Sequence, residues 1–153
     1  MALIAIAAMA MAACGGDTLY SDSQHVNSDG WDMNKGLTYS VEVNDTTDNY
    51  VCYVDIRNSV KYQYSNIYFH LTTIYPKGQV AVDTNIEFQL AESDGKWKGR
   101  DNGRYVDGRY PFCLIHFPET GTYHFTIHHA MRDSLLKGIN DIGIHIERQT
   151  HRQ

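Results

Sequence analysis

Residues able to do chemistry are sparse in this chain, and histidine is the most frequent of them. Eight histidines occur, with His124, His128 and His129 as the densest group. On a strand His124 and His128 share a face but lie about 13 Å apart, whereas ligands of one metal ion lie within a few ångströms of one another. A site would need His116 or His145 from a neighbouring strand. We therefore expect exposed or core-edge histidines, with no metal and no cofactor.

Hydrolytic chemistry needs a nucleophile, a base and an orienting group brought together. The sequence contains no G-x-S-x-G elbow, no H-E-x-x-H helix and no paired-carboxylate motif. We therefore predict a protein that is not an enzyme.

The most specific chemical signal is Cys14. Residues 1–13 carry no charged or polar-uncharged side chain. As a helix they would span about 20 Å, less than the roughly 30 Å hydrocarbon core of a bilayer, but their length fits the apolar region of a secretory signal. Met11, Ala12, Ala13 and Cys14 resemble a bacterial lipobox, in which the cysteine sulfur is diacylated before cleavage. The sequence thus predicts a signal peptide over 1–13 and a lipid anchor at Cys14.

The flanks of this motif leave alternatives. No Lys or Arg precedes the apolar stretch, although a signal peptide normally begins with one. One interpretation is that the true translation start lies upstream. The other is that residues 1–13 are not a signal peptide but a buried Ala-rich helix, and that Cys14 is an ordinary thiol. Residues 14–30 are rich in Gly, Ser, Asp and Asn without apolar periodicity, which favours a flexible tether. Gly15 replaces the Asp that retains some lipoproteins at an inner membrane, and Gly16 with Asp17 is a weak surface-export signal. We expect the outer membrane, facing the periplasm.

Two further cysteines, Cys52 and Cys113, lie in strand-like runs on the same phase as apolar neighbours. Both should face the core. An exported chain reaches a compartment that permits disulfides, so a bridge between them is one possibility. The other is a pair of buried free thiols, since cysteine is also a common small hydrophobe.

Eleven tyrosines and two tryptophans offer a binding surface. Tyr62, Tyr64 and Tyr68 share one phase and predict an outward ladder of rings, unless they are ordinary cross-strand pairs on a solvated face. Trp97, with Arg100 close by in a polar and cationic loop, is the best single contact residue. The alternative is that Trp97 covers the end of the fold.

The elements that must position these residues are strands. Apolar and polar residues alternate in short windows from Trp31 onward, separated by Gly, Pro, Asn and Asp. This predicts an all-β antiparallel sandwich, jelly-roll-like, of about seven to eight strands over 31–148, with a tail at 149–153. A loop is expected over 93–108 and a short helical turn near 131–139, and a closed barrel is the second candidate fold. The strand-like runs are Leu37, Tyr39, Val41, Val43; Tyr50, Cys52, Val54, Ile56; Ile67, Phe69, Leu71; Val80, Val82, Ile86, Phe88, Leu90; 112–117; Tyr123, Phe125, Ile127, His129; and Ile142, Ile144, Ile146.

Length and charge limit the classes of partner. A chain of 153 residues makes one domain, and its net charge of -5 includes no dense Lys/Arg run. Nucleic acid and anionic membranes would therefore find no basic surface, so membrane attachment must be covalent.

Several stretches resemble a known family, and the most specific is the last. It comprises His129, Ala130, Met131, Arg132, Leu136, Gly138, Ile139, Asp141, Ile142, Gly143, Ile146 and Glu147. Earlier matches include Arg57 and Asn58, Tyr62 to Tyr68, Asp83 and Thr84, Asp94 to Trp97, and Gly121 with Tyr123. In order and spacing they resemble the gliding motility lipoprotein GldH family of Bacteroidetes, from about Trp31 to Glu147.

This resemblance implies a small envelope lipoprotein that supports gliding motility, a process linked in these bacteria to type IX secretion. Its expected partners are the membrane, through the lipid anchor, and other envelope or gliding and secretion proteins. No small-molecule ligand is expected. The alternative function is a glycan-binding module on the same fold, for which a concave groove lined by two or more exposed aromatic residues would be the mark.

Overall fold

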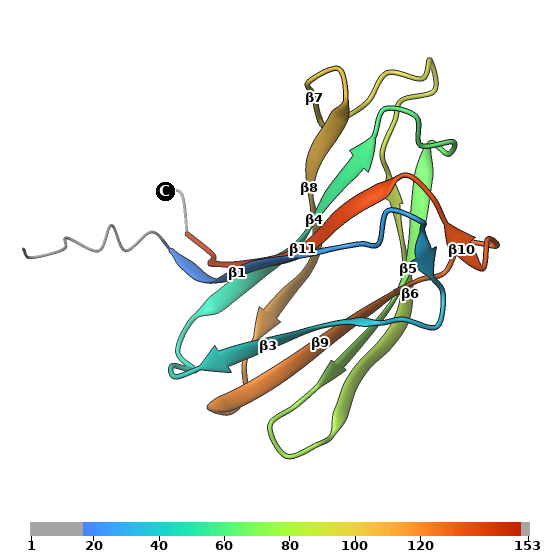
Figure 1. Cartoon of the computed structure of the whole chain (residues 1–153). Coiled ribbons are helices and arrows are strands. Elements are labelled where there is room, and N and C mark those ends of the chain that lie inside the picture. Colours follow the sequence, from blue (N-terminus) through green and yellow to red (C-terminus); the bar gives the residue numbers. More distant parts are fainter. Residues whose placement is uncertain (1–16, 151–153) are drawn as a thin grey trace, which may run out of the picture.

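The computed structural model describes residues 17–150, and every regular element in that range is a β-strand. The strands form two main antiparallel sheets and one small one, drawn in Figure 1. Their bounds are β1 (Thr18–His25), β2 (Trp31–Asp32), β3 (Leu37–Val43), β4 (Asn49–Ser59), β5 (Asn66–Ile74), β6 (Val80–Gln89), β7 (Arg100–Asp101), β8 (Tyr105–His116), β9 (Gly121–His129), β10 (Leu135–Leu136) and β11 (Ile139–Arg148). No helix in this range is long and apolar enough to cross a membrane.

The five-stranded sheet has the order β1-β11-β4-β8-β7, so β11 lies between β1 and β4. Three isoleucines of β11, Ile142, Ile144 and Ile146, are fully buried. Opposite them on β4 lie Ile56, Val54 and Cys52, which also face inward. Because side chains alternate between the two faces of a strand, β4 and β11 each place one side on the core, as the sequence predicts.

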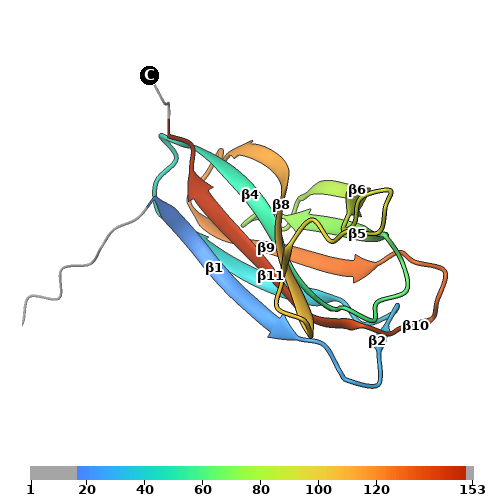
Figure 2. The same ribbon diagram turned by 90° about the horizontal axis from the view of Figure 1, so that it is seen from above.

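The four-stranded sheet has the order β3-β9-β5-β6. Its inward side chains include Tyr39, Val41, Phe69, Tyr123 and Phe125, all buried. Seen from above in Figure 2, the two sheets lie one over the other, and the hydroxyl of Tyr39 donates a hydrogen bond to the carbonyl of Ile142 in the opposite sheet. The fold is therefore an antiparallel β-sandwich, and the closed-barrel alternative is wrong because no strand pairing joins the two sheets among the described residues.

The expected tether is shorter than predicted. Residues Thr18 to His25 form β1 and pair with β11 along its length, from Thr18 opposite Glu147 to His25 opposite Asp141. Val26 follows, and it is buried in the core. The expectation of a flexible segment over 14–30 is wrong for these residues, because backbone pairing with a central strand orders them without an apolar pattern of their own.

The region expected to hold a short helical turn is also extended. Residues 131–134 contain bends, and Leu135 and Leu136 then form β10, paired with β2. The loop expected over 93–108 contains β7 and the first residues of β8. In β6, Val80 and Val82 are exposed although their spacing predicts burial. They lie in the half of this edge strand nearest the β5–β6 connection, whereas Phe88 in the other half is buried.

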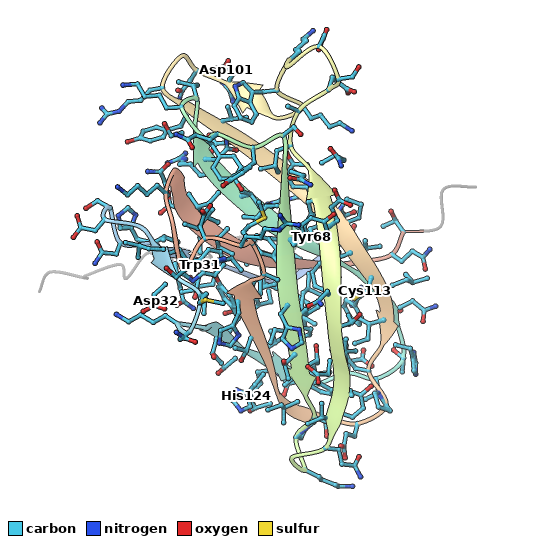
Figure 3. The ribbon with its side chains drawn as sticks, turned by 90° about the vertical axis from the view of Figure 1, so that its right-hand side faces the viewer. Trp31, Asp32, Tyr68, Asp101, Cys113 and His124 are labelled. Carbon is cyan, nitrogen blue, oxygen red and sulfur yellow. The ribbon has the colours of Figure 1, made fainter. Side chains whose placement is uncertain are left out.

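The sandwich has two distinct ends. At one end, the terminal end, Thr18 and Arg148 lie beside each other, together with the β3–β4, β5–β6 and β8–β9 connections. At the opposite far end lie β2, β7, β10 and the β4–β5 connection. In Figure 3, Asp101 of β7 marks the far end and His124 lies toward the terminal end.

Candidate binding surface

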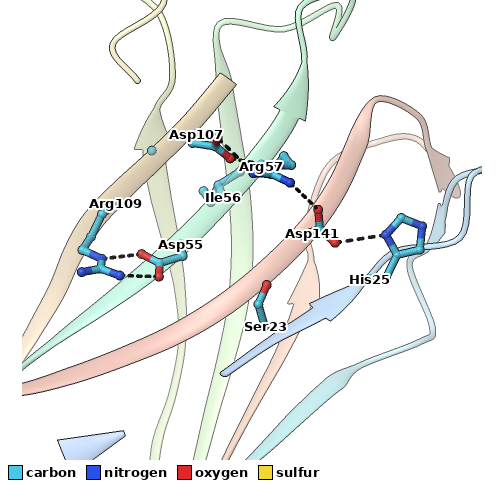
Figure 4. A pocket seen from close by; sticks show the side chains of 9 residues that line it. Ser23, His25, Asp55, Ile56, Arg57, Asp107, Arg109 and Asp141 are labelled. Atoms are coloured by element: carbon cyan, nitrogen blue, oxygen red, sulfur yellow. Dashed lines mark hydrogen bonds and ion pairs between the residues drawn. The ribbon is translucent and has the colours of Figure 1, made fainter. Parts of the chain in front are cut away.

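A hollow of about 700 Å³ lies over the outer face of the five-stranded sheet. Strand pairing sets His25, Asp141, Arg57 and Asp107 opposite one another across β1, β11, β4 and β8, so that basic and acidic side chains alternate. Nε of Arg57 donates to Asp107 at 2.6 Å, and Nδ1 of His25 lies 3.0 Å from Asp141 (Figure 4). The hydrogen bond to Asp107 raises the pKa of Arg57.

A second pair continues this pattern. Arg109 donates to both carboxylate oxygens of Asp55, at 2.7 and 2.8 Å (Figure 4). The hydrogen bond raises the pKa of Arg109. Exposed pairs of this kind contribute about 0–1 kcal/mol each. Since each arginine is already paired with a carboxylate, this face has the character of a solvated sheet surface.

A different kind of surface surrounds Tyr64 at the far end. Its ring is 38% exposed, and its edge packs against the ring of Tyr62 with centroids 5.6 Å apart. The hydroxyl of Tyr64 donates to Asp133 at 2.6 Å, and this hydrogen bond raises the pKa of Tyr64. Held from two sides, Tyr64 forms a fixed wall between two hollows.

The first hollow, of about 540 Å³, lies between Tyr64 and Tyr68. Ala130, Met131 and Arg132 form its remaining lining. The chain there is held by backbone contacts, because the amide of Ala130 donates to the carbonyl of Tyr68 at 2.7 Å, and the amide of Tyr68 lies 3.3 Å from the Met131 sulfur. Tyr68 is 40% exposed. The hollow is therefore concave and has two exposed tyrosines.

The second hollow, of about 400 Å³, lies on the other side of Tyr64. Two lysines, Lys61 and Lys137, line it together with Asp133 and Leu135, and Leu135 is 45% exposed. Both hollows together are called the Tyr64 surface below. Its residues are Lys61, Gln63, Tyr64, Tyr68, Ala130, Met131, Arg132, Asp133, Leu135, Lys137 and Gly138.

Gly138 fixes the chain under the second hollow. Its φ of +91° lies in the left-handed region that glycine adopts without strain. A Cβ at this position would lie 3.1 Å from the Cα of Tyr62. The carbonyl of Gly138 accepts a hydrogen bond from the amide of Ser59, at 2.8 Å. Glycine thus permits the close approach of two segments that bear the Tyr64 surface.

The aromatic residues predicted to bind lie in different environments. Tyr62 is 5% exposed, and its hydroxyl donates to the carbonyl of Asn66. It lies in the turn before β5, so the predicted outward ladder of Tyr62, Tyr64 and Tyr68 is wrong for its first member. Trp97 is half-buried and packs against the core. Arg100 is exposed on β7, and the structure does not bring it to the Tyr64 surface.

Sequence reasoning did not select the charged and apolar members of this surface. Met131 and Arg132 belong to the C-terminal stretch that carries the family resemblance, and Lys61 and Lys137 are isolated lysines with no periodic neighbours. Only the strand topology brings residues 61–68 beside 130–138. The one signal in the sequence that could have indicated a binding segment was the concentration of Gly, Ser and charged residues over 130–138, between two strand-like runs.

The two cysteines face each other on neighbouring strands. Cys52 on β4 is directly opposite Cys113 on β8, and both are free thiols in the structure. Cys52 is buried and Cys113 is partly exposed. Their mutual hydrogen bond, together with burial, raises the pKa of Cys52, while the same hydrogen bond lowers the pKa of Cys113.

The histidines have separate partners. Nε2 of buried His129 lies 2.9 Å from the carbonyl of Trp31, and Nδ1 of His124 lies 3.0 Å from the Ser40 hydroxyl. Burial lowers the pKa of His129. Within residues 17–150, no group of three or more His, Cys, Asp or Glu side chains is arranged to hold a metal ion.

An antiparallel sandwich with an aromatic, partly cationic surface at the end away from its termini is thus the class of protein that the geometry defines. The model of the GldH lipoprotein family matches residues 18–146, nearly the whole described range. The chain belongs to the GldH lipoprotein family.

Two relatives have names of this family. The gliding motility lipoprotein GldH homolog of Christiangramia forsetii is 27% identical over 143 residues, covering 88% of this chain and 86% of the relative. The gliding motility lipoprotein GldH of Flavobacterium johnsoniae is 27% identical over 158 residues, covering 96% and 95%. Among solved structures, a family GH115 4-O-methyl-α-glucuronidase aligns with a TM-score of 0.41 at 12% identity, over 84% of this chain and 16% of that one, which is too distant to support any inference.

Proposed function

We propose that this chain is a lipid-anchored, non-catalytic protein of the cell envelope that binds other envelope proteins. By this binding it supports gliding motility or the type IX secretion machinery linked to it. Its relatives are named gliding motility lipoproteins, and Cys14 stands in a lipobox-like sequence. Cys14 lies outside the described residues, so the anchor is inferred from the sequence and the family.

The observation that carries the binding function is the position of the Tyr64 surface. The described chain starts and ends at the terminal end, where the amide of Arg148 donates to the carbonyl of Asp17. An anchor at Cys14 therefore holds this end at the membrane, and the Tyr64 surface at the far end points away from it. We place the protein at the outer membrane, facing the periplasm, as the residues after Cys14 suggest.

Acyl labelling of the protein expressed in its native envelope tests the anchor. We expect labelled fatty acid in the wild-type protein and none in Cys14→Ala. Equal labelling of the two proteins would refute the anchor.

Crosslinking and pull-down from the native envelope test the binding function. We expect Tyr64→Ala to lose partners that the wild-type protein retains, because the ring separates and shapes both hollows. Leu114→Ala is the matched control, since Leu114 is 61% exposed on β8 and lies outside the surface. If both variants keep every partner, the Tyr64 surface is not the docking site.

A glycan-binding module is the second candidate, and the hollow between Tyr64 and Tyr68 favours it. Exposed aromatic rings in a concave groove can stack on sugar rings. Binding to a glycan array that disappears in Tyr68→Ala would support this function. Silence on the array, together with recovery of envelope proteins, would remove it.

A further inference from the structure

We propose that the Tyr64 surface binds an acidic segment of a partner polypeptide, in which carboxylates alternate with apolar side chains. This inference rests on the proposed docking function and adds the chemistry of the partner. The charges around Tyr64, the apolar side chains between them, and the acidity of the rest of the molecule support it.

Cationic groups surround Tyr64 and have no carboxylate partner. Lys61, Arg132 and Lys137 are exposed, and none of them forms an ion pair within residues 17–150. The only carboxylate lining either hollow, Asp133, already accepts the hydrogen bond from Tyr64. In contrast, Arg57 and Arg109 on the five-stranded sheet are neutralised by aspartates. The Tyr64 surface is thus a place where incoming carboxylates find unpaired positive charge.

Apolar side chains lie between these charges. Leu135 is 45% exposed in the second hollow, and half-buried Met131 lines the first. The aliphatic side chains of Leu135 and Met131 can pack against apolar side chains of a peptide, and the flexible methionine can adapt to side chains of irregular shape. Sugar rings, in contrast, stack on flat aromatic faces. An amphipathic acidic peptide therefore fits both hollows better than an anionic glycan does.

The rest of the molecule favours the same partner. The chain has a net charge of -5. At the terminal end, exposed Asp45 forms no ion pair within residues 17–150, whereas Asp48 is paired with Arg148 and Glu119 with Lys77. An acidic segment is repelled by the net charge of the molecule and attracted to the unpaired Lys61, Arg132 and Lys137, so that electrostatics favours this site over the rest of the surface.

The test uses the full-length protein in its native envelope and two crosslinkers. A photoreactive phenylalanine in place of exposed Gln63, which lines the second hollow, reports any partner at the surface. A carbodiimide joins an amine only to a carboxylate in direct contact, so it reports the chemistry. We expect amide links from Lys61 or Lys137 to Asp or Glu of the same partner that the photoreactive group captures.

Raising the salt from about 0.1 M to 1 M shortens the Debye length from about 10 Å to about 3 Å, so the carbodiimide links should be lost. Lys35 and Lys96 are matched controls, because both are exposed lysines at the far end outside the surface. The variant Lys61→Glu with Lys137→Glu should lose the photoproduct, and Lys35→Glu with Lys96→Glu, which changes the charge equally, should keep it.

The outcomes separate the two proposals. A photoproduct with a protein but without carbodiimide links at Lys61 or Lys137 would overturn the acidic chemistry and leave the docking function intact. A photoproduct with a glycan would overturn both in favour of the second candidate. No photoproduct at position 63 would remove the docking function at this surface. Carbodiimide links that are equally frequent at Lys35 and Lys96 would also overturn the inference.

Discussion

Among single residues, Gly138 has the clearest structural requirement. Gly138→Ala forces an L side chain into φ +91° and brings its Cβ to 3.1 Å from the backbone of Tyr62. Gly78→Ala is the matched control, since Gly78 has φ +85° but no atom within 4 Å of the place that a Cβ would occupy. We expect each change to cost about 1–2 kcal/mol of unfolding free energy for the left-handed conformation, and Gly138→Ala to cost more. Equal values in urea denaturation would contradict the packing requirement.

His129 should give the protein a pH-dependent stability. Burial lowers its pKa in the folded state, whereas in the unfolded chain it titrates near its ordinary value of about 6.5. The unfolded state therefore binds more protons below that value, so the unfolding free energy falls as the pH drops through this range and levels off below the folded pKa. Between about pH 7.5 and pH 5.5, we expect a smaller fall in His129→Gln than in the wild type. His116→Gln, which changes an exposed histidine, should keep the wild-type fall.

The facing pair Cys52 and Cys113 should form a disulfide in the exported protein. Residues directly opposite on antiparallel strands have Cα atoms about 4.5–5.5 Å apart, within the range for a bridge. The two thiols would lose two protons and two electrons to a disulfide oxidant of the envelope. We expect iodoacetamide to label them only after reduction, and to label Cys113 in Cys52→Ala without reduction. Labelling of both thiols in unreduced wild-type protein would contradict the bridge.

At the scale of elements, β11 holds the five-stranded sheet together. It pairs with β1 on one side and β4 on the other, and Ile144 is fully buried. Ile144→Ala should lower the unfolding free energy by about 2–5 kcal/mol, and Leu114→Ala by less than about 0.5 kcal/mol. A chain ending at Asn140 should not fold, because β1 loses its partner in the sheet and β4 loses one of its two partners. A cooperative melt of that shortened chain, close to that of the full domain, would show that β11 is not integral.

The strands that alternation predicts are those with one apolar face against the core, such as β3, β9 and β11. Alternation of apolar and polar residues fails to predict a strand where backbone pairing alone orders the chain. In β1 the residues are mostly exposed and polar, and its register is set by β11. The stretch after β9 has helix-like spacing, but the amide of Met33 donates to the carbonyl of Ser134 and draws it into pairing with β2. Such partners, far apart in sequence, leave no local pattern.

The candidate site follows the same rule. Exposed tyrosines near residues 64–68 were identified from their type and phase, while Tyr62 was misplaced because the strand begins only at Asn66. Residues from 130–138 join the surface through pairing of β9 with β5, which the local sequence does not reveal. Composition therefore predicted the kind of surface, and topology determined which residues form it.

For the whole molecule, the start of β1 sets how far the domain stands from its proposed anchor. Whatever conformation residues 14–17 adopt, Cys14 and Thr18 are separated by four residue steps, at most about 14 Å. Inserting about twelve Gly and Ser residues before Thr18 would add a mean reach of about 19 Å. Energy transfer from a dye at position 77 to acceptors in the bilayer should therefore fall on insertion. Unchanged transfer would mean that the domain lies against the membrane for another reason.

Such a short linker between Cys14 and Thr18 confines the domain to a thin layer above the bilayer. A partner anchored in the same membrane then meets it by lateral diffusion in two dimensions, at an effective concentration set by the depth of that layer instead of the volume of the compartment. Because residues Thr18 to His25 form a strand and not a tether, the far end of the domain reaches a smaller volume in which to meet a partner. Even an interface too weak to survive in dilute solution would be largely occupied on the membrane.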